Sequence, residues 1–234
     1  MTVRIAIDAT SDRLSIAADR DGGAPVSRSL QGARQHAGAL LPLLDEVLAN
    51  VGARIGDVSL VAVADGPGSF TGIRVAFAAA KALATEGAAL VTTPSLLVRA
   101  AGLIVSSSHR LESVLAVSAA LRGEVYAGLW RFDLPRGIDA VMEPRTLSLR
   151  DIDTLPSFDR AVGDGPEDIL SAVRAERAWP EATVLLRLID VPGAVRPIDS
   201  PLDFEPQYGR PAEAAAKWER DHGRPLPDSP GHAG

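Results

Sequence analysis

Short apolar runs and amphipathic stretches alternate along the first hundred residues of the chain. Short apolar runs rich in β-branched residues predict strands, whereas apolar residues spaced three and four apart predict helices. Between residues 38 and 50 the apolar residues follow helical spacing, at Leu40, Leu41, Leu44, Val47 and Leu48. The expected elements, in order, are strands at residues 3–7, 14–18 and 24–30, a helix at 38–50, a strand at 60–64, a helix at 72–86, a strand at 88–92 and a helix from 94 to about 103.

This order, three strands followed by alternating helices and strands, is typical of the ribonuclease-H-like half of the actin and sugar-kinase architecture. From residue 106 the pattern restarts more weakly. The further elements expected there are strands at 114–118 and 125–132, a helix at 166–177, a strand at 183–189 and a short helix at 212–220. We therefore expect an α/β protein with an actin-like ATPase (ASKHA, ribonuclease-H-like) fold of two lobes. Its parts are an N-terminal ribonuclease-H-like lobe at 1–105, a smaller, reduced second lobe at 106–222, and a disordered tail at 223–234.

Composition narrows the classes of function. The chain has 234 residues, a formal net charge of -6 and no cysteine. Thiolate catalysis and thiolate metal sites are therefore excluded. The excess of acidic residues argues against this chain binding a nucleic-acid backbone without a partner, because phosphate binding needs clustered Lys and Arg. No apolar run reaches the roughly 18 to 20 residues of a membrane span, and the N-terminus has no secretory pattern, so we expect a cytoplasmic protein.

The densest glycine pattern follows the strand at 60–64, in the run Asp65-Gly66-Pro67-Gly68-Ser69-Phe70-Thr71-Gly72-Ile73-Arg74. A strand, a glycine turn and a helix N-terminus can form an anion cradle, because unpaired N–H groups converge there. The same glycines equally allow another backbone to approach closely. Pro67 removes one N–H donor and no P-loop lysine follows, which favours the structural interpretation. The alternative is an actin-like, ATP-binding phosphotransferase whose phosphate contacts would be Asp8, Thr10 and Ser11.

Carboxylates near strand ends suggest a second enzymatic alternative. Asp8, Asp65 and either Asp45 or Glu46 occupy positions from which a ribonuclease-H-like nuclease holds two Mg²⁺ ions. In the opposing interpretation, Asp8 and Asp65 belong to turns, and Asp45 and Glu46 are solvated helix residues. The net charge also disfavours a metal-dependent nuclease, because such an enzyme must hold a polyanionic substrate.

The helix after the glycine turn has little side-chain bulk, since its residues include Gly72, Ala76, Ala78, Ala79, Ala80, Ala82 and Ala84. Another helix can therefore approach it closely. Together with the leucine stripe of the first helix, it predicts a packing surface shared with a protein partner, the alternative being packing on its own sheet. The four histidines are not spaced for a helical metal site. His36, near the start of the first helix, fits a capping or interface role.

These residues resemble the TsaB (YeaZ) family, a subunit of the bacterial machinery that makes N6-threonylcarbamoyladenosine (t6A) in tRNA. The run from Gly66 to Arg74 looks like the signature of that family. Four further stretches are similar to it: Arg4-Ile5-Ala6-Ile7-Asp8-Ala9-Thr10-Ser11, Gln35-His36 with Leu40-Leu41-Pro42-Leu43-Leu44-Asp45-Glu46-Val47-Leu48, Gly123-Glu124-Val125-Tyr126, and Pro206-Gln207-Tyr208-Gly209-Arg210. One departure is Ala119-Ala120-Leu121, where the family usually has Asp-Ala-Arg.

The resemblance implies a non-catalytic scaffold subunit with an actin-like fold, which pairs with and activates the catalytic paralogue TsaD. That paralogue holds a metal through a His-x-x-x-His motif, whereas the corresponding residues 95–99 here contain no histidine. A small ATPase, TsaE, is expected to join the pair, tRNA to be bound only through the complex, and the subunit to form a homodimer when alone. No cofactor is expected in this chain, and ATP and metal only in partner subunits. The expected interface residues are His36, Leu40, Leu41, Leu44, Phe70, Thr71, Gly72, Arg74, Val75, Ala76 and Ala79.

Overall fold

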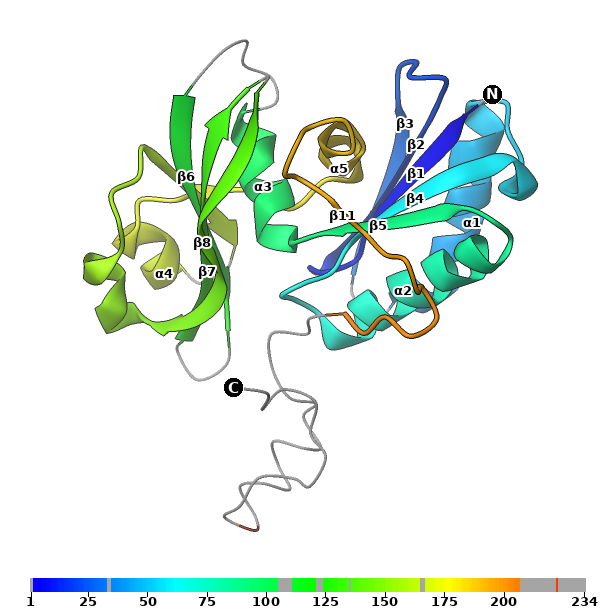
Figure 1. Cartoon of the computed structure of the whole chain (residues 1–234). Helices are drawn as coiled ribbons and strands as arrows, with labels where there is room; N and C mark the ends of the chain where they lie inside the picture. The colour runs from blue at the N-terminus through cyan, green and yellow to red at the C-terminus, as the bar shows by residue number, and fades with distance from the viewer. Residues whose placement is uncertain are drawn as a thin grey trace.

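The computed structural model describes residues 2–32, 35–104, 111–120, 124–134, 136–164, 167–206 and 222. It has two mixed sheets, one of six strands and one of five, with two helices between them and two more on the outer face of the larger sheet (Figure 1). The α/β, two-lobed architecture expected from the sequence is thus confirmed. In the described part of the chain, no helix combines the length and the apolar character that crossing a membrane requires.

The larger sheet has the strand order β11-β5-β4-β1-β2-β3, in which β1, β4 and β5 run parallel. β11 is antiparallel to β5 and β2 is antiparallel to β1, whereas β3, antiparallel to β2, runs in the same direction as β1. Its elements and the helices of its connections are β1 (Val3–Asp8), β2 (Arg13–Arg20), β3 (Val26–Gln31), α1 (His36–Asn50), the 3-10 helix η2 (Ile55–Asp57), β4 (Val58–Ala64), α2 (Phe70–Thr85), β5 (Ala89–Thr93), α3 (Ser95–Ile104) and β11 (Arg196–Pro197). Every element predicted between residues 3 and 103 is present, with ends shifted by a few residues.

The two faces of this sheet are built from different residues. Val3, Ile5 and Ile7 of β1 pack in one cluster with the buried leucines of α1 and the buried face of α2. Ala6, which alternates with them, belongs to a second cluster with α3 and with α5 (Ala182–Leu188). Because successive side chains of a strand point to opposite faces, α1 and α2 cover one face of the sheet and α3 and α5 the other. Small alanines on the second face let α3 and α5 lie close to the strands.

The smaller sheet has the order β10-β9-β6-β7-β8. Its elements are β6 (Leu111–Ala119), β7 (Glu124–Asp133), β8 (Gly137–Ser148), the 3-10 helix η4 (Leu149–Thr154), β9 (Arg160–Asp164), α4 (Glu167–Ala172) and β10 (Glu176–Arg177). Val114, Ala116 and Trp130 of this sheet share one buried cluster with α3 and α5. The two lobes are therefore joined by a continuous core through α3, which is buried along almost its whole length.

Several predictions for the second half of the chain are wrong. Residues 183–189 were expected as a strand, but α5 is a helix there, and the helix expected at 166–177 is only α4 followed by β10. Moreover, α5 and β11 pack on or join the first sheet, so the expected assignment of all of 106–222 to the second lobe needs correction. The reason is that the apolar side of α5 is buried against the alanine face of the first sheet. The helix expected at 212–220 and the tail at 223–234 lie outside the described residues.

Candidate functional site

The glycine turn packs backbone to backbone against the turn between β1 and β2. The Ser69 N–H donates to the Thr10 carbonyl oxygen at 2.6 Å. A Cβ atom added to Gly68 would lie 2.1 Å from that same oxygen, and one added to Gly72 would lie 1.9 Å from the Ala9 carbonyl oxygen. Of the two uses of these glycines that the sequence left open, the structure shows the close approach of a second backbone.

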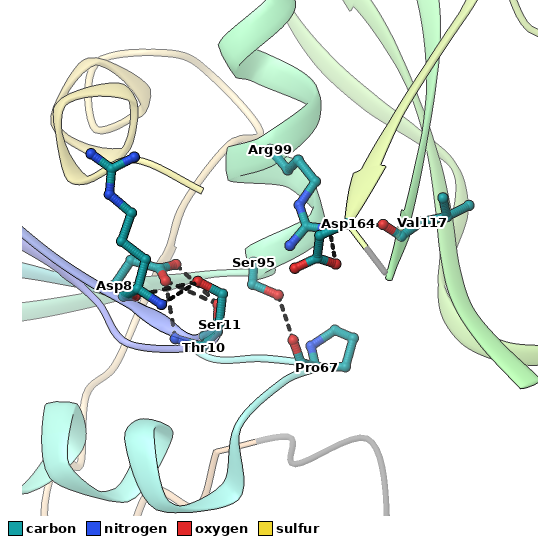
Figure 2. A network of polar contacts seen from close by, with 9 residues as sticks. Asp8, Thr10, Ser11, Pro67, Ser95, Arg99, Val117 and Asp164 are labelled. Carbon is teal, nitrogen blue, oxygen red and sulfur yellow. Dashed lines mark hydrogen bonds and ion pairs between the residues drawn. The ribbon is translucent and has the colours of Figure 1, made fainter. Parts of the chain in front are cut away.

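The polar groups of the turn are engaged inside the chain. The Ser69 side chain caps α2 by accepting the Gly72 N–H at 3.2 Å. At the start of α3, the Ser95 N–H donates to the Gly66 carbonyl at 2.8 Å, and the Ser95 hydroxyl donates to the Pro67 carbonyl at 2.7 Å. The turn is therefore tied to the β1–β2 turn on one side and to α3 on the other (Figure 2).

A cleft of about 320 Å³ opens between the lobes next to these turns. Its lining residues are Thr10, Ser11, Asp12, Gly68, Ser69, Ser118, Ala119, Ala120, Tyr126 and Asp164. This set contains hydroxyls and two carboxylates, and among the described lining residues there is no Lys or Arg. The volume is at the lower end of the roughly 300 to 1,000 Å³ of small-molecule sites.

Asp8 lies fully buried at the end of β1, beside this cleft. Its carboxylate accepts hydrogen bonds from the Thr10 N–H and the Thr10 hydroxyl, both at 3.0 Å. Burial raises the pKa of Asp8 to about 7, and the Thr10 hydrogen bonds and the charge of Arg99 only partly oppose this. The Asp8 carboxyl group is therefore hydrogen-bonded within the turn that follows β1, which agrees with the interpretation of Asp8 as a turn residue.

Arg99 of α3 links the two lobes. Its side chain is buried, and its Nη1 atom donates to the Val117 carbonyl of β6 at 2.8 Å and to the Asp164 carboxylate, at the end of β9, at 2.5 Å. Figure 2 shows Arg99 and Asp164 across from Asp8, Thr10 and Ser11, with Ser95 between the two groups. Because the ion pair is largely removed from water, it fixes how the lobes meet at the cleft.

The other carboxylates of the nuclease alternative do not gather around Asp8. Asp65 is buried and its carboxylate pairs with Arg196 of β11 at 2.7 Å. Burial raises the pKa of Asp65, and Arg196 opposes that rise. Asp45 and Glu46 lie exposed on α1, where Glu46 pairs with Arg28. Within the described residues, no group of three His, Asp or Glu side chains is placed to hold a metal ion.

The expected interface residues divide into two sets by burial. Those inside the core are His36, Leu40, Leu44, Gly72 and Ala76, each at most 2% exposed where a value is given, so they pack within the chain. On the surface, Leu41 is 57% exposed, and Thr71 and Arg74 are also exposed. Phe70, Val75 and Ala79 are half-buried, and the Arg74 guanidinium lies over the Phe70 ring at 4.6 Å.

Two arginines at the centre of this arrangement were missed by the sequence reasoning. Arg99 is the one charged residue in the apolar helix Ser95–Ile104, which is a signal that such a side chain has a buried partner. Arg196 lies in the short irregular stretch Val191-Pro192-Gly193-Ala194-Val195-Arg196-Pro197, and nothing in the sequence marks it as the partner of Asp65.

The sheet order, the shared core and the polar cleft define a two-lobed, actin-like protein. Two solved structures share its fold. YeaZ from Pseudomonas aeruginosa aligns with a TM-score of 0.69 at 23% identity, covering 80% of this chain and 90% of that one. A protein with similarity to the peptidase YEAZ, from the same organism, aligns with a TM-score of 0.76 at 22% identity, covering 90% of this chain and all of the other.

The family follows from the sequence comparison. The model of the family described as TsaD, tRNA N6-adenosine threonylcarbamoyltransferase, matches residues 30–156, more than half of the chain, and the chain belongs to this family. Its curated relatives are TsaB proteins, named for tRNA threonylcarbamoyladenosine biosynthesis. The protein of Haemophilus influenzae is 40% identical over 93 residues, and that of Escherichia coli 31% identical over 154 residues. These matches span 39% and 64% of the relatives' lengths, and 40% and 62% of this chain.

Proposed function

We propose that this chain is a non-catalytic subunit of the machinery that makes t6A in tRNA, and that it pairs with and activates a TsaD-type catalytic paralogue. Membership of the TsaD family, with relatives named TsaB, is the observation that carries the proposal. ATP and a metal are then held by partner subunits. A TsaE-type ATPase joins the pair in the cytoplasm, and tRNA is bound through the complex, since a chain with a net charge of -6 is poorly suited to grip it.

The chemistry of the cleft supports a non-catalytic role. A nucleotide triphosphate would meet Asp12 and Asp164 there, without a cation from the described lining residues. The Gly68 and Gly72 positions, which could have cradled a phosphate, are instead filled by the Thr10 and Ala9 carbonyls. In many enzymes the lobes close over a bound substrate. The continuous core through α3 joins the two lobes here and opposes such a closure.

The outer surface of α1 and α2 is the proposed docking face, defined by Leu41, Thr71 and Arg74 with the half-buried Phe70, Val75 and Ala79. Exposed alanines such as Ala78 and Ala82 let a partner helix approach closely. The face also carries acidic residues on α1, at Asp45 and Glu46, and a basic residue on α2, at Arg74. An isologous interface uses the same surface of both copies, so this face is also the one proposed for self-pairing when the paralogue is absent.

The docking face is tested by charge substitution at its exposed members. We expect L41E combined with R74E to weaken binding to purified TsaD by about 100-fold or more in calorimetry, because an apolar contact and a cation are both replaced by carboxylates. The matched control is L111E, which alters a similarly exposed leucine, 71% exposed, on β6 of the second lobe. It should leave the affinity unchanged. Equal binding by the double variant and the unaltered chain would contradict the proposed face.

Calorimetry with ATP and Mg²⁺ on the isolated chain separates the scaffold from the phosphotransferase alternative. The acidic cleft should give no saturable binding at concentrations up to about 1 mM, corresponding to less than about 4 kcal/mol of binding free energy. Stoichiometric binding that disappears in D8N would instead support an ATP-dependent enzyme.

A further inference from the structure

After α5, which already packs on the first sheet, the chain runs along the first lobe as a strap, defined here as residues 194–206. The Thr93 hydroxyl donates to the Ala194 carbonyl at 2.6 Å, β11 pairs with β5, and the Ile198 N–H donates to the Leu90 carbonyl at 2.9 Å. Figure 1 shows this segment, in orange, passing from the edge of the larger sheet toward α2. Backbone pairing therefore fixes the first half of the strap to the sheet.

The strap holds the glycine turn and α2 at two separate places. At the start of the turn, the Arg196 guanidinium pairs with the buried Asp65 carboxylate at 2.7 Å. Along α2, the Lys81 ammonium donates to the Leu202 carbonyl at 3.0 Å. The rings of Phe77 and Phe204 stack with their centroids 5.4 Å apart.

These two anchors bracket the docking residues in the first turns of α2. Thr71 and Arg74 lie between Asp65, where the first anchor holds the chain, and Phe77, where the second begins. The side chain of Asp65 is 3% exposed, whereas that of Arg196 is 55% exposed. Loss of Arg196 leaves Asp65 buried without its charge partner. The carboxyl group then either takes up a proton or is hydrated through a shift of the backbone at the entrance to α2, and both change the contacts of the glycine turn.

We propose that Arg196 is a positioning residue, which acts through Asp65 to hold the glycine turn and the first turns of α2 in the conformation that a partner binds. Arg196 itself need not touch the partner. The inference rests on the proposed function, because the face that it positions is the proposed docking face. It adds that the affinity of this face depends on a segment more than a hundred residues further along the chain.

The experiment compares R196M with R196K, and with R187M as the matched control. Arg187 is an exposed arginine on α5, so its replacement removes the same charge without touching the turn. We expect R196M to weaken TsaD binding about 10-fold, within the usual range for coupling between sites. R196K, which keeps the charge, should stay within about threefold of the unaltered chain, and R187M should bind normally.

Hydrogen exchange supplies the readout that a general loss of stability would not give. In R196M the amides of residues 66–76 should exchange faster at temperatures well below the unfolding midpoint, while those of β6 and β7 keep their protection. F204A, which loosens the second anchor, serves as the second variant and should raise exchange around residues 77–81 and weaken binding as well. The exchange and binding data of F204A can be interpreted even if the R196M variant folds poorly.

The outcomes separate the two claims. Unchanged TsaD affinity in both R196M and F204A, beside a large loss in the L41E/R74E variant, overturns the positioning role and leaves the docking face in place. If the unaltered chain does not bind TsaD, the proposed function fails. Local exchange at 66–76 then still decides whether Arg196 holds the turn, and normal protection there rejects that claim on its own.

Discussion

Gly72→Ala is expected to lower the free energy of unfolding by about 3 kcal/mol or more, although alanine is the best helix former. The added Cβ would lie 1.9 Å from the Ala9 carbonyl oxygen, a backbone atom that cannot rotate away. Relief requires separating the glycine turn from the β1–β2 turn, which also breaks the hydrogen bond between Ser69 and Thr10. Urea denaturation of the isolated chain measures the effect.

The matched control for this substitution is Gly38→Ala on α1. A Cβ at Gly38 meets nothing within 4 Å, so alanine should be neutral or should stabilise the helix by up to about 1 kcal/mol. The two substitutions should therefore differ by about 3 kcal/mol or more in the free energy of unfolding, with only Gly72→Ala destabilising the chain. A Gly72→Ala protein as stable as its Gly38→Ala counterpart would show that the two backbones do not lie in contact.

Asp8→Asn is expected to change how stability depends on pH. Burial raises the pKa of Asp8 from 3.8 to about 7, so the folded state disfavours the ionised carboxylate. Since the folded pKa is the higher one, stability from this group is complete below about pH 4 and is lost as the pH rises through 7. The full difference corresponds to about 4 kcal/mol.

Denaturation curves between pH 5 and pH 8 measure this difference. Across that range the unaltered chain should lose about 3 kcal/mol relative to Asp8→Asn, because the amide has no charge to bury and keeps an oxygen for the Thr10 hydrogen bonds. Asp45→Asn, on the exposed face of α1, is the control and should run parallel to the unaltered chain. Parallel curves for Asp8→Asn would mean that the buried carboxylate is not held at its raised pKa.

The first lobe is predictable because its strands are bounded by clear turn residues and its helices have regular stripes. β1 illustrates the limit of that reasoning. Its run of apolar residues shows that both faces are buried, but only the structure shows that Val3 and Ile5 face α1 and α2 while Ala6 faces α3 and α5. The only sign of this difference in the sequence is the small size of Ala6, which suits a face where helices lie close to the strands.

The wrong prediction for residues 183–189 has a physical reason. Four of the five residues at 184–188 are apolar, a pattern that is compatible with a buried strand or a buried helix. The β-branched residues Thr183 and Val184 favour the strand. In the folded chain, the Ser15 hydroxyl accepts the Ala182 N–H at 3.0 Å and fixes the start of α5. That contact joins residues far apart in sequence, which periodicity cannot predict.

In the candidate site, too, the sequence predicts local features but not the contacts between distant residues. The glycine turn could be located from the sequence, but its use by a second backbone could not. The partners of Arg99 and Arg196 are 65 and 131 residues away, beyond any local pattern. The interface prediction, which stays a prediction, included the buried stripes of α1 and α2 together with their exposed residues. Leu40 and Leu44 face the core, and Leu41 is the exposed neighbour.

The central claim is that this chain assists a threonylcarbamoyl transfer without performing it. The most direct measurement is transfer to tRNA in a mixture of purified TsaD, TsaE, ATP, Mg²⁺ and a threonylcarbamoyl donor. We expect transfer with the unaltered chain or with D8N, little transfer with L41E/R74E, and none when TsaD is omitted. Transfer without TsaD, or its loss in a D8N protein that still binds TsaD normally, would contradict the claim and make this chain an enzyme.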